Sequence, residues 1–211
     1  MIASRVTVRV PYSAGPRHLR STQSSVIIQH VADANVAGTI EVLRLASHNE
    51  YNIPIHYTST IAVYGVVNHK TVLLETDRET GASWDDLHFG YAQTKWMAEQ
   101  LMWQAVDVGL VVAMYRAPFI TASTGAVPQY HMDDVLPTAL IAMFGSAVSI
   151  QSNRDIYIMP VDEVSRDMVH MIFSDQPPYS QSVNMVTTPL NMKELSRVLE
   201  RRHGLKTVAV P

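Results

Sequence analysis

The sequence predicts an α/β protein in which parallel strands form a sheet and helices cover its faces. From residue 32 onward, short β-like runs alternate with helical segments of ten or more residues. One strand-like run, residues 110–115, is almost wholly apolar, as expected of a strand that is buried on both faces. With 211 residues, of which 47% are hydrophobic, the chain is long enough for one sizeable core.

Residues 1–31 differ from the rest of the chain. Prolines and polar residues interrupt them, and they contain only two β-like runs, at residues 6–10 and 26–29. We expect this segment to be irregular and its sequence not to belong to the domain that follows.

From residue 32 the predicted elements follow one another closely, apart from one long loop. Helices are indicated by apolar residues three and four apart, and strands by short apolar runs between turn residues. Gly109 suits the left-handed position just past a helix end. The predicted order is helix 33–47, strand 53–58, loop 66–90, helix 91–107, strand 110–115, helix 134–144, strand 156–159, a helix capped by Asp162, strand 183–187 and a last helix capped by Asn191.

Composition excludes several classes of function. The net charge of −3 supplies no broad basic field, so we expect no nucleic-acid partner. The absence of cysteine excludes disulfides, thiolate metal sites and cysteine nucleophiles, and it fits a reducing compartment. The nine histidines lack metal-ligand spacing, and no apolar run approaches the roughly 18 residues that a membrane span needs. We expect a cytoplasmic protein with no metal and no membrane partner.

A tyrosine and a lysine four residues apart, Tyr91 and Lys95, open the second long helix. Residues at this spacing share a helix face, so we expect the ammonium to lower the pKa of the phenol from about 10 toward neutrality. Such a tyrosine can give a proton to a carbonyl oxygen while hydride reaches the carbon, and the lysine can bind the ribose of a nicotinamide cofactor. By itself the spacing is weak, because an ordinary surface pair has it too.

Two strand ends give this pair a context. The segment Thr58–Gly65 follows one predicted strand, where a hydroxyl can polarise a substrate carbonyl at the ligand-binding edge of an α/β sheet. A Ser/Thr turn leaving a strand is the ordinary alternative. The segment Tyr115–Ile120 leaves the next strand, and alone it is merely a strand exit followed by a proline. The order of these pieces and their placement at strand ends favour a site.

Taken together, these segments resemble the thioester reductases, a family of extended short-chain reductases. The resemblance covers residues 32 to about 202, and two helices carry most of its specificity. The matching segments are Asn35–Ala46, His56–Thr60 at the catalytic strand end, Gly90–Glu99 on the Tyr/Lys helix, Arg116–Ile120 beside the nicotinamide, Met159–Arg166 on the substrate side and Val183–Val186 in a late strand.

The resemblance implies a Rossmann-type, doubly wound parallel sheet with a small C-terminal substrate-binding region at about residues 121–182. It also implies that an acyl thioester, held on the phosphopantetheine arm of a carrier protein, is released as an aldehyde or alcohol with NADPH. Asn35 would support the site from the neighbouring helix, or else its amide bonds the backbone inside the sheet. Asp134 begins the substrate region, although a helix cap explains it as well. By this resemblance the catalytic residues are Thr60, Tyr91 and Lys95, and the cofactor-binding residues are Thr58, Tyr91, Lys95, Pro118, Phe119 and Ile120.

One part of the family pattern does not occur. No three of the nine glycines have the G-x-x-G-x-x-G spacing whose backbone holds a cofactor pyrophosphate. The choice of NADP over NAD therefore rests on the resemblance and not on a residue. We expect residues 32–211 to form a reductase domain that is truncated at its N-terminus, with exposed strand edges.

Other functions stay open beside reduction. The chain could be a non-catalytic remnant or a carrier-protein-binding module that lacks the cofactor cradle. It could also be a nucleotide-sugar epimerase or dehydratase, or a fatty acyl-CoA reductase. These enzymes of the same superfamily carry Ser/Thr, Tyr and Lys in the same order, although Asn35–Ala46 fits the epimerases less well. Resemblance of fold does not by itself confer activity.

Overall fold

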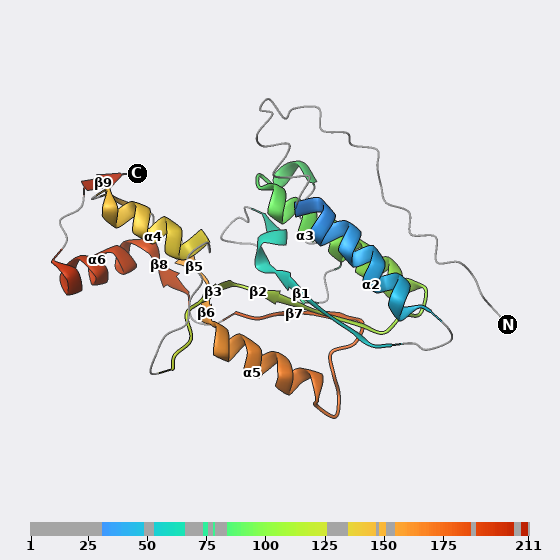
Figure 1. Cartoon of the computed structure of the whole chain (residues 1–211). Coiled ribbons are helices and arrows are strands. Elements are labelled where there is room, and N and C mark those ends of the chain that lie inside the picture. The colour runs from blue at the N-terminus through green and yellow to red at the C-terminus, as the bar shows by residue number, and fades with distance from the viewer. Residues whose placement is uncertain are drawn as a thin grey trace. The chain divides into compact units, whose positions relative to one another are not determined.

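The structure is a computed structural model, drawn as a cartoon in Figure 1. The chain divides into two compact units. The first unit holds residues 1–116 and 172–184, and the second holds residues 117–171 and 185–211. The described residues are 31–48, 53–65, 74–75, 78, 84–125, 135–146, 148–150, 155–186, 189–204 and 208–210. The predicted β-like runs at residues 6–10 and 26–29 lie outside them, as does most of the predicted loop 66–90.

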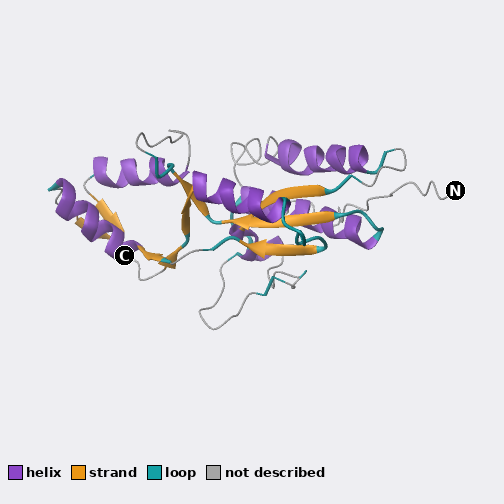
Figure 2. Ribbon diagram, turned by 90° about the horizontal axis from the view of Figure 1, so that it is seen from below, coloured by secondary structure: helices purple, strands orange, loops and turns teal. Residues whose placement is uncertain are grey.

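Among its described residues, the first unit is built on a sheet of three strands, β1 (Ile55–Thr60), β2 (Val112–Ala117) and β7 (Gln181–Asn184). Their order is β1-β2-β7, and the strands lie side by side in Figure 2. Strands β2 and β7 are parallel, with Arg116 opposite Asn184. All six residues of β2 are buried, as predicted for a strand covered on both faces. The prediction of an α/β protein with a parallel sheet is confirmed.

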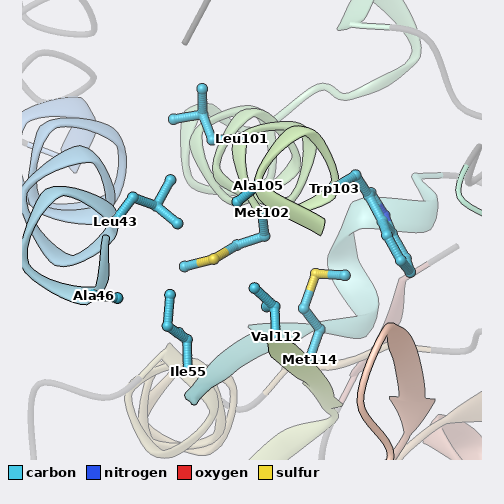
Figure 3. Close-up of a cluster of buried hydrophobic side chains, with 9 residues drawn as sticks. All are labelled: Leu43, Ala46, Ile55, Leu101, Met102, Trp103, Ala105, Val112 and Met114. Carbon is cyan, nitrogen blue, oxygen red and sulfur yellow. The ribbon is translucent and has the colours of Figure 1, made fainter. Parts of the chain in front are cut away.

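Two helices of the first unit pack against these strands. Helix α2 (Gly38–Ala46) continues from a π-helical turn, η1 (Asp33–Ala37), and helix α3 spans Gly90–Asp107, close to the predicted bounds of both helices. After α3, Gly109 has a φ of 94°, which confirms its predicted left-handed position. The apolar cluster between the helices and the strands consists of Leu43, Ala46, Ile55, Leu101, Met102, Trp103, Ala105, Val112 and Met114 (Figure 3).

The strand bounds differ from the predicted ones by about two residues. The strand predicted at 53–58 occupies 55–60, because pairing begins where Ile55 N donates to Val111 O at 2.8 Å. Pro54, just before it, has no N–H to give to a neighbouring strand. The shift matters for the site, since Thr60 becomes the last residue of β1. A short 3-10 helix, η2 (Ile61–Tyr64), follows directly.

The described residues of the second unit form three helices, α4 (Val135–Gly145), α5 (Val161–Ile172) and α6 (Met192–His203), and three two-stranded pairings. Helices α4 and α6 agree with prediction, and the Asn191 side chain accepts a hydrogen bond from Lys193 N, which confirms the predicted cap. The parallel pairs are β3 (Phe119–Thr121) with β6 (Ile158–Pro160) and β4 (Val148–Ile150) with β9 (Val208–Val210), and the antiparallel pair is β5 (Asp155–Ile156) with β8 (Leu190–Asn191).

The predicted capping role of Asp162 is wrong. Helix α5 already begins at Val161, and the Asp162 carboxylate accepts hydrogen bonds from the Thr124 backbone N–H, at 3.0 Å, and from the Thr124 hydroxyl. These bonds lower the pKa of Asp162. The carboxylate therefore fastens the segment after β3 to the start of α5. Asp134 lies outside the described residues.

Within the described part of the chain, no helix is both long enough and apolar enough to cross a bilayer. The same residues contain no group of three or more His, Cys, Asp or Glu side chains that could hold a metal ion.

Candidate active site

Two hydroxyl side chains predicted to hold a substrate oxygen are neighbours in the first unit. Thr60 ends β1, and its Oγ1 accepts a hydrogen bond from Ala62 N at 3.2 Å, which caps η2. Tyr91 is the second residue of α3, and its phenol lies near enough to the Thr60 side chain for a hydrogen-bonding interaction to lower its pKa. The end of a strand and the start of a helix thus bring together two residues that are 31 positions apart in the sequence.

The Tyr91 side chain is 48% exposed, which leaves it accessible to a ligand. Partial burial raises the pKa of the Tyr91 phenol above its ordinary value of 10, and the hydrogen bond with Thr60 acts in the opposite sense. The expectation that Lys95 lowers this pKa is therefore wrong for the structure. At neutral pH the phenol carries its proton and can donate it.

Lys95 lies one turn along α3 but binds the strand rather than the phenol of Tyr91. Its Nζ donates to Thr58 O at 2.8 Å and to Tyr57 OH at 3.4 Å, and it lies 4.8 Å from the centroid of the Tyr57 ring. Burial lowers the pKa of Lys95, while the charge of Glu99 raises it. An ammonium group has three donors, and these contacts within the described residues use two of them. One donor is then left for a ligand such as a ribose hydroxyl, so the residues present fit a nicotinamide cofactor.

Sequence reasoning missed Tyr57. Its side chain supports Lys95 and forms a hydrogen bond with Thr39 on α2, and burial strongly raises its pKa. The alternation of strand residues was the available signal, because a strand places Tyr57 and Ser59 on the face opposite to that of Thr58. The Ser59 hydroxyl is buried without a hydrogen-bond partner among the residues described.

Asn35 is joined to the start of α3. Its Nδ2 donates to Thr94 Oγ1 at 3.0 Å, and Thr94 Oγ1 donates to Tyr91 O at 2.9 Å. Thr39 Oγ1 in turn donates to Asn35 O at 2.6 Å. These bonds tie η1 to the turn that carries Tyr91. They agree with support from the neighbouring helix rather than with an amide bound to the sheet backbone.

A fully buried ion pair lies within the same unit, and the sequence analysis did not identify it. Glu99, on α3, and Arg116, on β2, are each 0% exposed. Arg116 Nη2 lies 2.7 Å from Glu99 Oε2, and Arg116 Nε lies 3.0 Å from Glu99 Oε1. Burial alone would lower the pKa of Arg116, but the hydrogen bonds and charge of Glu99 raise it on balance. An arginine in an apolar strand and a glutamate four residues after Lys95 were the signals available.

Of the remaining predicted cofactor residues, Thr58 belongs to the first unit, and Pro118, Phe119 and Ile120 belong to the second. Pro118 is buried, whereas Phe119 and Ile120, in β3, are 45% and 37% exposed. Thr58 meets Lys95 through its carbonyl oxygen. The roles of these residues toward a cofactor stay predictions.

Comparison with known proteins gives the context of this site. Residues 22–168 match a model of an NAD-binding family described as male sterility protein. Among curated relatives, the isonitrile lipopeptide synthase of Streptomyces coeruleorubidus is 29% identical over 79% of this chain, and the aldehyde reductase lnaA of Aspergillus flavus is 32% identical over 67%. The chain spans only 11% and 14% of those two proteins. The carboxylic acid reductase of Mycobacterium marinum is 31% identical over 54% of the chain.

Solved structures agree on the fold. The terminal R domain of the myxalamid PKS-NRPS pathway superposes with a TM-score of 0.72 and 29% identity, covering 84% of this chain and 44% of that domain. The UDP-glucuronic acid 4-epimerase of Bacillus cereus superposes with a TM-score of 0.62 over 85% of this chain and 54% of its own. At 15% identity, the epimerase shows a shared fold alone.

Proposed function

The chain belongs to the thioester reductase branch of the NAD-binding family described as male sterility protein, and from this premise we propose that it reduces a carrier-bound acyl thioester with NADPH. The product is an aldehyde or, after a second reduction, an alcohol. The observation that carries the proposal is the proximity of the Thr60 and Tyr91 side chains at the end of β1 and the start of α3, with Lys95 one helical turn away. The printed names of the relatives support this choice, since they include an aldehyde reductase and a carboxylic acid reductase.

In the proposed reaction, Thr60 and Tyr91 hold the carbonyl oxygen of the thioester. A nicotinamide cofactor, when bound, supplies a hydride for the carbonyl carbon. Tyr91 donates its phenolic proton to the oxygen as negative charge develops there, which gives a hemithioacetal. Loss of the carrier thiol from that carbon breaks the C–S bond and leaves the aldehyde. The raised pKa of Tyr91 suits this role, because it keeps the phenol protonated before the reaction.

Lys95 is assigned to the cofactor ribose through the donor that its contacts with Thr58 O and Tyr57 OH do not use. Pro118, Phe119 and Ile120 are assigned to the nicotinamide on the resemblance alone. NADPH rather than NADH, a carrier protein with its phosphopantetheine arm and a place in the cytoplasm are assigned on the same ground.

A second candidate is a carrier-protein-binding module without catalysis. One observation favours it: no glycines in the chain have the spacing of the phosphate-binding turn. An epimerase or dehydratase is less favoured, because the sequence identity to the epimerase is only 15%.

A titration of the purified chain with NADPH, followed by fluorescence, separates the two candidates. We expect saturable binding for the wild type. Since a hydrogen bond to a charged group contributes about 1.5–3 kcal/mol, Lys95→Met should weaken the binding roughly tenfold or more. Arg44→Met, which removes an exposed cation of α2 in the same unit, is the matched control and should bind as the wild type does. Absence of saturable binding up to about millimolar NADPH, where even weak complexes form, would favour the carrier-binding module instead.

A further inference from the structure

A chain of buried polar contacts joins the strand ends of the first unit to helix α3. Arg116 donates to Glu99 through Nε and Nη2 and to the Tyr64 phenol oxygen through Nη1, at 2.5 Å. The guanidinium also lies 4.8 Å from the centroid of the Tyr64 ring. Tyr64 OH in turn donates to Asn184 Oδ1 at 2.7 Å. We call Glu99, Arg116, Tyr64 and Asn184 the anchor cluster.

Each member of the anchor cluster comes from a different element. Glu99 lies on α3, Arg116 on β2 and Asn184 on β7, and Tyr64 ends η2, the short helix that Thr60 caps. The contacts therefore fix the exit of β1 against the ends of the other two strands. They also fix the face of α3 on which Lys95 lies, since Glu99 follows Lys95 by one helical turn.

Stability alone is a poor explanation for the buried ion pair of Glu99 and Arg116. Removing two charges from water is costly, and apolar residues of similar size often stabilise a core as well or better. What an ion pair adds is a required geometry, because the fork of a guanidinium matches a carboxylate in few orientations. This distinguishes the anchor cluster from the apolar core around Leu101, which only needs to fill space.

We infer that Glu99 and Arg116 are positioning residues of the proposed reductase site. They hold α3 in register with the strand ends, and they thereby keep Tyr91 and Lys95 in place against Thr60. The inference rests on the proposed function for its catalytic meaning. The placement of Lys95 itself is a property of this chain and can be measured without any turnover.

The surroundings of Lys95 show why its reactivity reports on the pair. The groups that face it within the described residues are the Thr58 carbonyl and Tyr57 on β1 and the Glu99 carboxylate on its own helix. Glu99 raises the pKa of Lys95, and the two hydrogen bonds protect the amine. Loss of the Glu99 charge leaves more of the amine neutral, and loss of the hydrogen bonds leaves it more accessible. Either loss therefore increases the rate at which Lys95 is acylated.

The test measures acetic anhydride labelling of Lys95 as a function of pH, read by mass spectrometry of the peptide that contains it. In Glu99→Gln the half-labelling point of Lys95 should move to lower pH. Labelling at a fixed pH below that point should then be roughly twofold faster or more, as even a modest pKa change gives. Labelling of Lys193 in the same sample is the internal reference. Glu41→Gln is the matched control, because Glu41 only pairs with Arg44 on the exposed face of α2.

A second variant guards against a failure to fold. Glu99→Met combined with Arg116→Met removes both charges, so no unpaired charge stays buried. Because the net charge of the pair does not change, faster labelling of Lys95 in this variant reports loss of its hydrogen bonds to Thr58 O and Tyr57 OH, and we expect that faster labelling. If both variants lower the melting temperature and leave the labelling curve of Lys95 unchanged, the pair is merely structural and the inference is overturned.

Steady-state kinetics of Glu99→Gln test the inference independently of labelling. With NADPH and an acyl thioester, Glu99→Gln should lower kcat about tenfold because Tyr91 is displaced, and it should raise KM for NADPH because Lys95 no longer meets the ribose. A rise in KM with kcat unchanged would contradict the positioning of Tyr91. Absence of turnover in the wild type would count against the proposed function, while the labelling result would still decide the role of the pair.

Discussion

Thr60 illustrates how one side chain can serve both the fold and the proposed chemistry. Its Oγ1 caps η2 through Ala62 N, and its hydroxyl is also near enough to the Tyr91 phenol to lower the pKa of that group. A hydroxyl has one donor and two acceptor positions, so these tasks are compatible. The cap holds the hydroxyl at the strand end, where a substrate oxygen would meet it.

Replacement of Thr60 by valine, which has nearly the same shape, tests whether the hydroxyl oxygen itself is needed for the reaction. Thr60→Val should reduce turnover of an acyl thioester by about 10²-fold, the usual effect of losing one donor to a developing oxyanion. Affinity for NADPH, measured by fluorescence, should stay close to that of the wild type. Thr60→Ser keeps the hydroxyl and should recover most of the rate. Equal losses in the Val and Ser variants would show that packing, not the hydroxyl, matters at this position.

At the scale of elements, strands β1 and β2 are also linked by side chains away from the candidate site. His56 Nδ1 lies 2.8 Å from Tyr115 OH, and the two rings stack with centroids 5.9 Å apart. The His56 ring also lies 5.5 Å from that of Tyr179. Burial lowers the pKa of His56 below its ordinary value of 6.5.

This shift predicts a loss of stability in mild acid. Because the folded pKa is the lower one, the unfolded chain binds more protons once the pH falls to about 6.5. Stability is therefore lost as the pH falls through that value toward the folded pKa, and it changes no further below it. The melting temperature should fall between about pH 7.5 and about pH 5.5, and His56→Phe should flatten that fall. His170→Phe, on the exposed face of α5, should leave the slope as it is, and a slope unaffected by His56→Phe would exclude His56 as its source.

The apolar core of the first unit contrasts with its polar anchor cluster. Leu101 is 0% exposed between α2, α3 and the strands, so Leu101→Ala should lower the free energy of unfolding by about 2–5 kcal/mol. Leu45, on α2, is 68% exposed, and Leu45→Ala should change that free energy by less than about 0.5 kcal/mol. Urea unfolding of the two variants measures both values. Similar losses would mean that the cluster in Figure 3 is not the main core.

At the scale of the whole molecule, the spacing of residues along the chain predicted the helices, whose formation depends on nearby residues. The period of apolar residues predicted α3 and the helical stretch formed by η1 and α2 to within a residue or two, and the spacing of Tyr91 and Lys95 predicted that they share a helix. The direction of the Lys95 ammonium could not be predicted, because a carbonyl and a phenol on β1 decide it. The partnership of Glu99 with Arg116 also depends on sheet packing, which a single sequence does not reveal.

The most direct test of the account is product formation by the chain itself. An acyl pantetheine thioester and NADPH are incubated with the wild type and with Tyr91→Phe, and aldehyde and alcohol are measured against the NADPH consumed. The account predicts product from the wild type and a loss of about 10²-fold or more in Tyr91→Phe, because the proton donor is gone while the ring remains. Product formed equally fast by Tyr91→Phe, or no product from a wild type that binds NADPH and the thioester, would contradict it.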